Sequence, residues 1–423
     1  MTLQKNLQKL KFFFLLAALF SFISCSQNKR NYLVVWTDTA DLASFAEDFN
    51  ASHNNSKVVI VYKEKAAAAL PPAADELQPD IVIASWLMNS SIRKHFASLD
   101  FMFKSGLLNK DDFYPQILEY GTIDDKQYLI PFSFNLPMVI YSSANEYLLQ
   151  DEHLLTLEHM EKISSEFNKK NDSGTYTAMG YAPGWDSTFL YEATKLNGAA
   201  YAERGRSFIW NEKAVNKTID QMKNWTTTFN TDTTTEKNFQ FRYLFMPKHR
   251  QISTGRSLFA SIKSNEFFKL DESQSEGINF RWLAAEGKIP IEDDIVSIGL
   301  YKATRHTNEA EVFISWLLNE KTQKHLIERK LSMKLDTTTF GLANGFSSIK
   351  ATNENYYPVY YRQLLGSLPG EKNLVVPDIL PYRWNSIKEK IILPYLEECV
   401  TTDSKKQPDS LKTRIENWNK QFY

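Results

Sequence analysis

The side chains that most often carry catalysis form no recognisable pattern in this sequence. Seven histidines are scattered along the chain without an HExxH motif. The nucleophile motif GxSxG, the dinucleotide motif GxGxxG and a P-loop lysine are also absent. Two cysteines are too few for a thiolate metal site, and the pair Asp293 and Asp294 is of a kind that arises by chance among 50 acidic residues. We therefore expect a binding protein that needs no cofactor and no metal.

The composition points to the class of ligand. Basic and acidic residues are balanced, at 49 and 50, which argues against nucleic acid as a partner. Aromatic residues make up 13% of the chain and include 20 tyrosines and nine tryptophans. This is more than packing requires, and because aromatic ring faces stack on sugar rings, a sugar-binding cleft is one use for the excess.

Residues 1–24 have the pattern of a lipoprotein signal peptide. A basic start is followed by the uncharged run Phe12–Ile23, which is too short for a helix that must span roughly 30 Å of hydrocarbon. Ser24 then precedes Cys25, the expected site of lipid attachment and membrane anchoring, although Phe22 stands where leucine is commoner. The alternative is an ordinary secretory signal with an incidental cysteine. Both alternatives predict an extracytoplasmic protein, with residues 25–31 as a tether and Cys399 as a small apolar residue.

The apolar pattern predicts two lobes of α/β structure. The runs at 32–36, 58–62 and 81–84 predict strands that are connected through helices and therefore pair in parallel, as in a doubly wound sheet. The extended run 128–141 contains two prolines, which indicates a strand that leaves one lobe and enters another. Further strands are expected at 255–262, 278–285 and 293–304, and one amphipathic helix at 309–328. The mature chain is longer than a single hydrophobic core usually supports, which also predicts two lobes.

A series of segments resembles the extracellular solute-binding proteins of family 1, the maltodextrin- and sugar-type receptors of ABC importers. No single motif is diagnostic, but the segments occur in the family's order over nearly all of the mature chain. They include YLVVWTDTADLASFAEDFN, QPDIVIASW, TIDDKQYLIPFSFNLPMVIYSS, GRSLFASI, DDIVSIGLYKATRHTNEAEVFISWLLNEKTQ and VVPDILPYRW. Two departures concern the ligand class more than the fold: KSNEFF stands where many relatives have a tryptophan, and 292–294 replaces a Gly-Gly pair.

The resemblance implies a type II periplasmic-binding-protein fold, in which two doubly wound lobes are joined by crossing hinge segments and close over a ligand. Lobe I would comprise 32–133 plus 296–345, and lobe II 138–294 plus 346–423, with hinges near 131–137 and 293–297. It also implies a monomer that delivers a sugar or another small polar solute to an ABC transporter permease. The alternatives are a binding or sensor lipoprotein without a permease, and a glycan-active lyase or hydrolase.

Residues after the first and third strands are candidate contacts, because carboxyl ends of parallel strands face the crevice of such a sheet. In the family, the position of Trp36 and the residues after it touch ligand, which here selects Asp38 and Thr39. Trp36 could equally be core. Ser85 and Trp86 have the same geometry after the third strand, and Trp86 is the stronger candidate because a core position would better suit isoleucine or valine.

Further candidates come from family positions later in the chain. Asn135 lies in the first crossing, where an amide can both donate to and accept from a sugar hydroxyl; the alternative is a turn residue. Trp185 and Asp186 resemble the aromatic and acid of sugar pockets, although a solvated loop would look the same. Family members have an aromatic ligand contact near the C-terminal end of the chain, and the segment that matches it here is Tyr382, Arg383 and Trp384. These residues could equally pack against the last helices.

Overall fold

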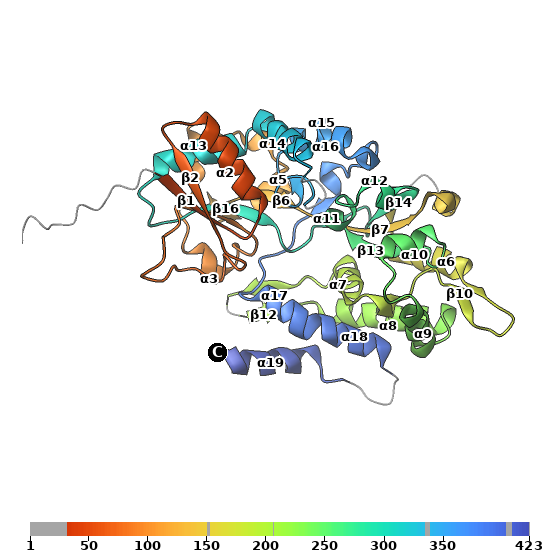
Figure 1. Cartoon of the computed structure of the whole chain (residues 1–423). Coiled ribbons are helices and arrows are strands. Elements are labelled where there is room, and N and C mark those ends of the chain that lie inside the picture. The colour runs from red at the N-terminus through yellow and green to blue at the C-terminus, as the bar shows by residue number, and fades with distance from the viewer. Residues whose placement is uncertain (1–31, 150–152, 206, 335–338, 403–407, 423) are drawn as a thin grey trace, which may run out of the picture.

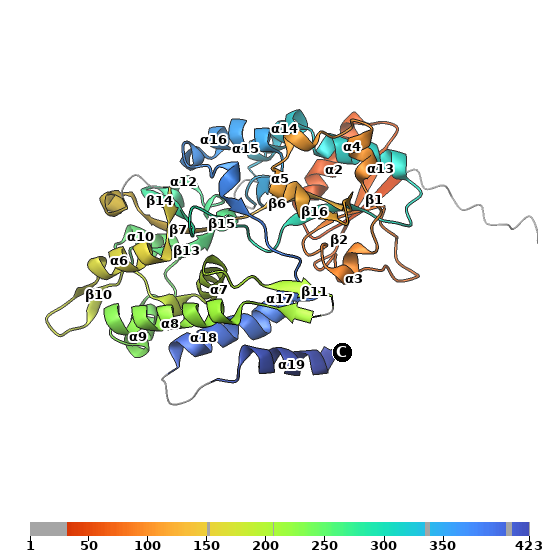
Figure 2. The ribbon, with the colours of Figure 1, turned by 180° about the vertical axis from the view of Figure 1, so that it is seen from behind.

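The computed structural model describes residues 32–149, 153–205, 207–334, 339–402 and 408–422. Two lobes, each built around its own sheet, lie side by side and are joined by extended segments (Figure 1; Figure 2). Within these ranges no helix has the length and apolar character needed to cross a membrane. The predicted signal peptide, tether and Cys25 lie outside the described residues.

Lobe I contains the predicted parallel strands. Its sheet has six strands in the order β17 (Phe346–Ser347), β6 (Leu129–Phe134), β16 (Val296–Leu300), β3 (Ile81–Ala84), β1 (Tyr32–Thr37) and β2 (Lys57–Tyr62). Strand β1 lies between β2 and β3 and pairs in parallel with both, which confirms that prediction, whereas β16 runs antiparallel to β3 and β6. Both β1 and β3 are buried on both faces, as expected where helices cover a sheet. These helices include α2 (Asp41–Ser52), α13 (Thr307–Leu317) and α14 (Glu320–Ser332).

The predicted passage between lobes at residues 128–141 is confirmed. Strand β6 belongs to the sheet of lobe I, and β7 (Pro137–Ser142) begins three residues later in the sheet of lobe II. Pro137 is the first residue of β7, a place where the missing backbone N–H is tolerated. A second crossing leads back from lobe II into β16, and a third follows β18 (Leu374–Val375), which pairs in parallel with β15 (Ile289–Pro290).

Lobe II has a smaller sheet covered by longer helices. Its strands are ordered β13 (Ala260–Lys263), β7, β14 (Ile278–Leu283) and β8 (Leu154–Leu155). Cys399 is buried on the inner face of α18, and burial raises the pKa of its thiol, which agrees with a packing role. The main helices of this lobe are α6 (Leu157–Phe167), α7 (Ser187–Leu196), α8 (Glu212–Phe229), α9 (Thr233–Arg242), α10 (Lys248–Ser253), α17 (Trp384–Ile387), α18 (Leu393–Thr401) and α19 (Leu411–Phe422).

The structure differs from the sequence expectation at several boundaries. The strand predicted at 255–262 begins later, as β13 at Ala260, because 255–259 form a turn and loop. The helix predicted over 309–328 is two helices, α13 and α14, because the Asn319 side chain accepts hydrogen bonds from the backbone N–H groups of Lys321 and Thr322 and starts a new helix. Residues 346–347 were assigned to lobe II, but they form β17, which pairs with β6 in lobe I. The return to lobe II therefore occurs later, along β18.

Candidate ligand-binding cleft

A cavity of about 260 Å³ lies between the lobes. Loops after β1 and β3 form one wall, and the segment 380–386 of lobe II forms the other. The cavity brings together the predicted contacts Asp38, Ser85, Trp86, Tyr382, Arg383 and Trp384. Sequence reasoning missed its other polar lining residues, which are Glu64, Lys65, Asn89, Tyr120, Asn385 and Ser386. Most of these lie in turns or short helices, whose residues carry no periodic signal.

Asp38 connects the two strand-end loops of lobe I. Its Oδ2 accepts a hydrogen bond from the Ser85 backbone N–H at 3.1 Å, and the Thr39 hydroxyl donates to its Oδ1 at 3.3 Å. Burial raises the pKa of Asp38 to about 6, repulsion from Asp294 adds to the rise, and the two hydrogen bonds oppose it. The cleft therefore contains a carboxylate that titrates near neutral pH and can accept hydrogen bonds from a ligand.

Trp86 and Arg383 face the cavity from opposite lobes, and both have left-handed backbone conformations. Their φ angles are +66° and +62°, which cost energy in residues other than glycine. The Asn89 side chain supports the turn at Trp86 by donating to its carbonyl oxygen at 2.9 Å. The half-buried Trp86 ring packs against apolar residues of both lobes. Backbone strain of this kind gathers at ligand sites, where the surrounding structure holds it in place.

Trp384 requires a correction, because it is not a loop residue that offers a free ring face. It begins α17 and is 2% exposed. Its ring packs against Phe208 and Tyr201, with ring centroids 5.2 and 5.6 Å apart, and its Nε1 donates to Asp293 Oδ2 at 3.0 Å. The more accessible part of this wall is the half-buried Tyr382 and the exposed Arg383, whose guanidinium lies 5.3 Å from the centre of the Tyr382 ring.

Trp36 and Thr39 lie behind the lobe I wall. Trp36 is fully buried, its Nε1 donates to the Leu77 carbonyl at 3.0 Å, and the Lys63 ammonium lies 4.1 Å from the ring centre. The core alternative for Trp36 is therefore the one that the structure supports. Thr39 is 8% exposed and holds Asp38 through its hydroxyl, so it positions a cavity residue rather than lining the cavity.

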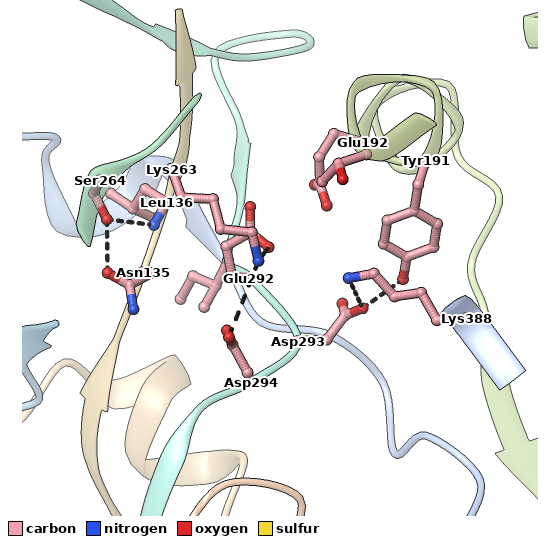
Figure 3. Close-up of polar contacts among 12 residues, drawn as sticks. Asn135, Leu136, Tyr191, Glu192, Lys263, Ser264, Glu292, Asp293, Asp294 and Lys388 are labelled. Atoms are coloured by element: carbon pink, nitrogen blue, oxygen red, sulfur yellow. Dashed lines mark hydrogen bonds and ion pairs between the residues drawn. The ribbon is translucent and has the colours of Figure 1, made fainter. Parts of the chain in front are cut away.

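Asn135 holds the first crossing instead of lining the cavity. Its Nδ2 donates to the Asn344 carbonyl at 2.9 Å, and its Oδ1 accepts from the Ser264 hydroxyl at 2.8 Å (Figure 3). The same hydroxyl accepts from the Leu136 backbone N–H at 3.1 Å. Both polar ends of the amide are thus used within the hinge, which explains the polar residue without a ligand.

Trp185 and Asp186 line a separate cavity of about 90 Å³ inside lobe II. The Trp185 ring stacks on Phe239 with centroids 5.6 Å apart, and its Nε1 donates to the Glu236 carbonyl at 3.1 Å. Asp186 caps α7 by accepting from the Thr188 N–H at 2.9 Å and pairs with Lys248 at 2.9 Å. In this conformation the two residues are not brought together with Trp86.

A buried charge cluster at the second crossing connects the cleft to the hinge (Figure 3). Asp293 accepts hydrogen bonds from Tyr191 at 2.6 Å, Trp384 at 3.0 Å, and Lys195 and Lys388 at 3.2 Å each. Burial alone would raise the pKa of Asp293, but the two ammonium groups and the two neutral donors lower it well below its usual value. The segment 292–294 was noticed in the sequence, but its lysine partners are too distant in the chain to be paired with it.

The remaining acids of this cluster surround Asp293. Glu192 and Glu292 are almost fully buried, and they pair with Lys195 at 3.2 Å and with Lys263 at 2.7 Å. Burial raises the pKa of Glu192 to about 7, and repulsion from Glu292 contributes. The described residues contain no group of histidine, cysteine and acidic side chains that could hold a metal ion. The cluster is therefore a structural ion-pair network beside the cleft.

Several solved structures with a similar fold are sugar-binding proteins. The chain matches the sugar-binding protein MalE from Xanthomonas citri with a TM-score of 0.65 and 12% identity, over 92% of this chain and 96% of that one. It matches the maltose-binding protein MalE from Listeria monocytogenes, in complex with maltose, with a TM-score of 0.61 and 17% identity, over 93% and 98%. It also matches CpMnBP1 with mannotriose bound, with a TM-score of 0.61 and 14% identity, over 92% of this chain and 98% of that one.

The sequence itself carries a family signal. No curated protein matches it significantly. The profile of the bacterial extracellular solute-binding protein family matches residues 36–324, which include most of lobe I, the sheet of lobe II and the first two crossings. The chain belongs to the family of bacterial extracellular solute-binding proteins.

Proposed function

We propose that this protein is a monomeric receptor that captures a sugar or oligosaccharide between its lobes and passes it to an ABC transporter permease. The observation that carries the proposal is the cavity of about 260 Å³ between the lobes, which combines aromatic rings, a carboxylate and a guanidinium. Rings stack on sugar faces, and charged groups bind hydroxyls through strong hydrogen bonds. Two of the similar proteins were solved with maltose and with mannotriose bound.

Closure of the lobes gives a mechanism for capture. Glu203 on the hairpin β11 (Ala202–Arg204) and β12 (Ser207–Ile209) reaches Ser90 of lobe I, accepting from its N–H at 3.2 Å and its hydroxyl at 2.9 Å. A ligand that contacts both walls favours the closed form because it binds that form better than the open one. The permease then recognises the closed surface. Hinges near 131–137 and 293–297 would carry the motion.

A thermal-shift screen over malto- and manno-oligosaccharides, monosaccharides, polyols, amino acids and peptides tests the ligand class. A sugar at 100 times its Kd should add about 2.7 kcal/mol to the free energy of unfolding. Chromatography of the same mixtures after long incubation separates binding from turnover. Stabilisation by amino acids or peptides alone would contradict the sugar proposal, and consumption of a glycan would favour the enzyme alternative.

Ligand affinity is expected to fall as the pH drops through about 6, the pKa of Asp38. The ionised carboxylate accepts hydroxyl hydrogen bonds more strongly than the protonated acid, so affinity is full at pH 7.5 and weakens by about tenfold at pH 5. Calorimetry at both values measures this. In Asp38→Asn the pH dependence should disappear and the affinity should be low throughout. An unchanged pH profile in that variant would show that another group titrates.

We also propose that lipid on Cys25 holds the receptor at the outer surface of a membrane. The support is the uncharged run that ends at Ser24, together with a family whose members act outside the cytoplasm. Cys25→Ala should move the protein from the detergent phase to the aqueous phase in a phase-separation assay, because one cysteine carries the anchor. Full retention in the membrane after the signal peptide has been removed would contradict the anchor.

A further inference from the structure

One stretch of lobe II is basic although the whole chain is nearly neutral. Residues 237–265 contain no aspartate or glutamate, while the chain as a whole has 50 acidic residues and a net charge of −1. The stretch runs from the middle of α9 through a turn, α10 and β13 to the residues just after β13. α9 lies at the outer end of lobe II, away from lobe I (Figure 1; Figure 2). Its cations are Lys237, Arg242, Lys248, Arg250, Arg256 and Lys263.

Three apolar side chains protrude from the middle of this basic stretch. Phe241, Leu244 and Phe245 are 75%, 56% and 96% exposed, and we call them the apolar tip. Phe239 on the same helix is buried against Trp185. Phe241 follows it by two residues, about 200° around the helix, and therefore points away from the lobe. Burial of Phe239 fixes the orientation of α9, and this orientation exposes Phe241. Packing in the core therefore does not explain why apolar residues occupy the exposed positions of the tip.

The cations around the tip remain accessible on the surface. Lys237, Arg250 and Arg256 are exposed. Arg242 is also exposed, although one of its nitrogens donates to the Tyr176 carbonyl at 2.9 Å. Lys263 is half-buried and pairs with Glu292 at 2.7 Å in the charge cluster beside the cleft, so it does not contribute.

Three acids that pair with or flank this stretch have structural roles. Asp186 pairs with Lys248 at 2.9 Å. Asp232 caps α9 by accepting from the Thr235 N–H at 2.7 Å, and Asp271 caps α12 (Glu272–Ser275). The exposed cations Lys237, Arg242, Arg250 and Arg256 thus lie in a stretch that contains no acid, around an apolar centre.

We propose that the apolar tip and its surrounding cations form a second surface, separate from the cleft, that docks on an anionic lipid bilayer. Exposed aromatic and leucine side chains beside lysine and arginine are the combination that binds the lipid interface, because the rings enter among the headgroups while the cations meet the phosphates. A bilayer accepts protruding rings without a matching pocket. A second copy of the chain would bring the same cations together and would be repelled.

Docking of this kind would hold lobe II to the surface independently of the lipid on Cys25. The tip alone gives weak and reversible binding, because it offers only three apolar side chains. The surface is distinct from the cavity lining, so capture of a solute does not depend on it. Whether or not the cleft takes a sugar, the surface can be tested by itself.

The test is vesicle sedimentation of the mature chain carrying Cys25→Ala, which has no lipid. We expect binding to phosphatidylcholine vesicles that contain phosphatidylglycerol, little binding to phosphatidylcholine alone, and weakening with salt. The triple variant Phe241→Ser, Leu244→Ser, Phe245→Ser should bind about tenfold more weakly. Lys237→Gln with Arg250→Gln should lose a similar factor and much of the salt dependence.

A matched control is Val359→Ser with Leu365→Ser, since these side chains are 64% and 76% exposed outside the basic stretch. It should bind as the parent does. A polarity-sensitive dye on Phe245→Cys should report an apolar environment only with anionic vesicles; Cys399 is buried and should not react. The proposal is overturned if anionic vesicles leave the parent in solution, or if the triple variant binds like the parent. It is also overturned if the triple variant abolishes self-association instead.

Discussion

Replacing Asp293 by asparagine is expected to lower the free energy of unfolding by about 3–5 kcal/mol, the range for removing one partner of a buried ion pair. The Asp293 side chain is 1% exposed and pairs with Lys195 and Lys388. The side chains of these two lysines are 11% and 10% exposed. In Asp293→Asn, two buried ammonium groups lose their shared counter-ion. Denaturant unfolding at pH 7 measures the loss.

The neighbouring variant Asp294→Asn is a matched control. Its side chain is 36% exposed and lies 4.0 Å from Lys263, so we expect a change below about 1 kcal/mol. The double variant Asp293→Asn, Lys388→Met should recover part of the loss, because it removes Lys388, whose ion pair is with Asp293, while Lys195 keeps its pair with Glu192. An Asp293→Asn protein that unfolds like the parent would show that solvent already reaches this cluster.

The effect of Asp293 depends on pH in a defined direction. Its pKa is lower in the folded chain than in the unfolded chain, so its contribution to stability is complete above the unfolded value of about 4. The contribution disappears as the pH falls below that value. The difference between the parent and Asp293→Asn should therefore be largest at neutral pH and should shrink in acid.

The sequence was most informative where the signal is local. Short apolar runs separated by helical segments predicted the parallel strands β1, β2 and β3. Of these, β1 and β3 are buried on both faces and therefore show continuous apolar runs. The paired prolines of residues 128–141 predicted the passage between lobes. The break between α13 and α14 was missed because the apolar period continues through it, and only the cap formed by Asn319 ends the first helix.

The candidate site was predictable only in part, because burial depends on distant partners. Trp36 lies inside β1, where other elements cover both faces, whereas Trp86 lies two residues beyond the end of β3 and reaches the cavity. A shift of a few residues relative to the strand end thus separates core from cleft. For Trp384 the deciding partner is Asp293, which lies 91 positions earlier in the chain, and no local pattern indicates that pairing.

Trp384→Ala is expected to destabilise the fold by about 3–5 kcal/mol, the range for emptying a buried aromatic site. The ring is 2% exposed and packs with Tyr191, Tyr201 and Phe208, and its Nε1 is one of the donors to Asp293. Loss of the ring opens a void and removes a hydrogen bond from a buried carboxylate. Denaturant unfolding should show the loss with or without ligand.

Trp86→Ala is expected to weaken ligand binding more than it lowers stability, the reverse of Trp384→Ala. Comparing the two variants therefore distinguishes a ligand contact from a core residue. The half-buried ring lines the cavity between the lobes, so its removal should weaken ligand binding by about 1–3 kcal/mol. Stability should change less than in Trp384→Ala, because part of the ring is already in water. Trp86→Gly should bind as poorly as Trp86→Ala but be more stable, by about 1 kcal/mol, since glycine tolerates the left-handed backbone at this position.

Calorimetry of ligand binding beside denaturant unfolding of the three variants separates the two roles. If Trp86 contacts a sugar in the cleft, the two Trp86 variants lose affinity and keep most of their stability. Trp384→Ala instead shows the larger loss in the free energy of unfolding. If Trp86→Ala binds like the parent and unfolds early, its ring is a packing element between the lobes. Recognition by aromatic stacking would then fall to Tyr382, the half-buried aromatic of the opposite wall.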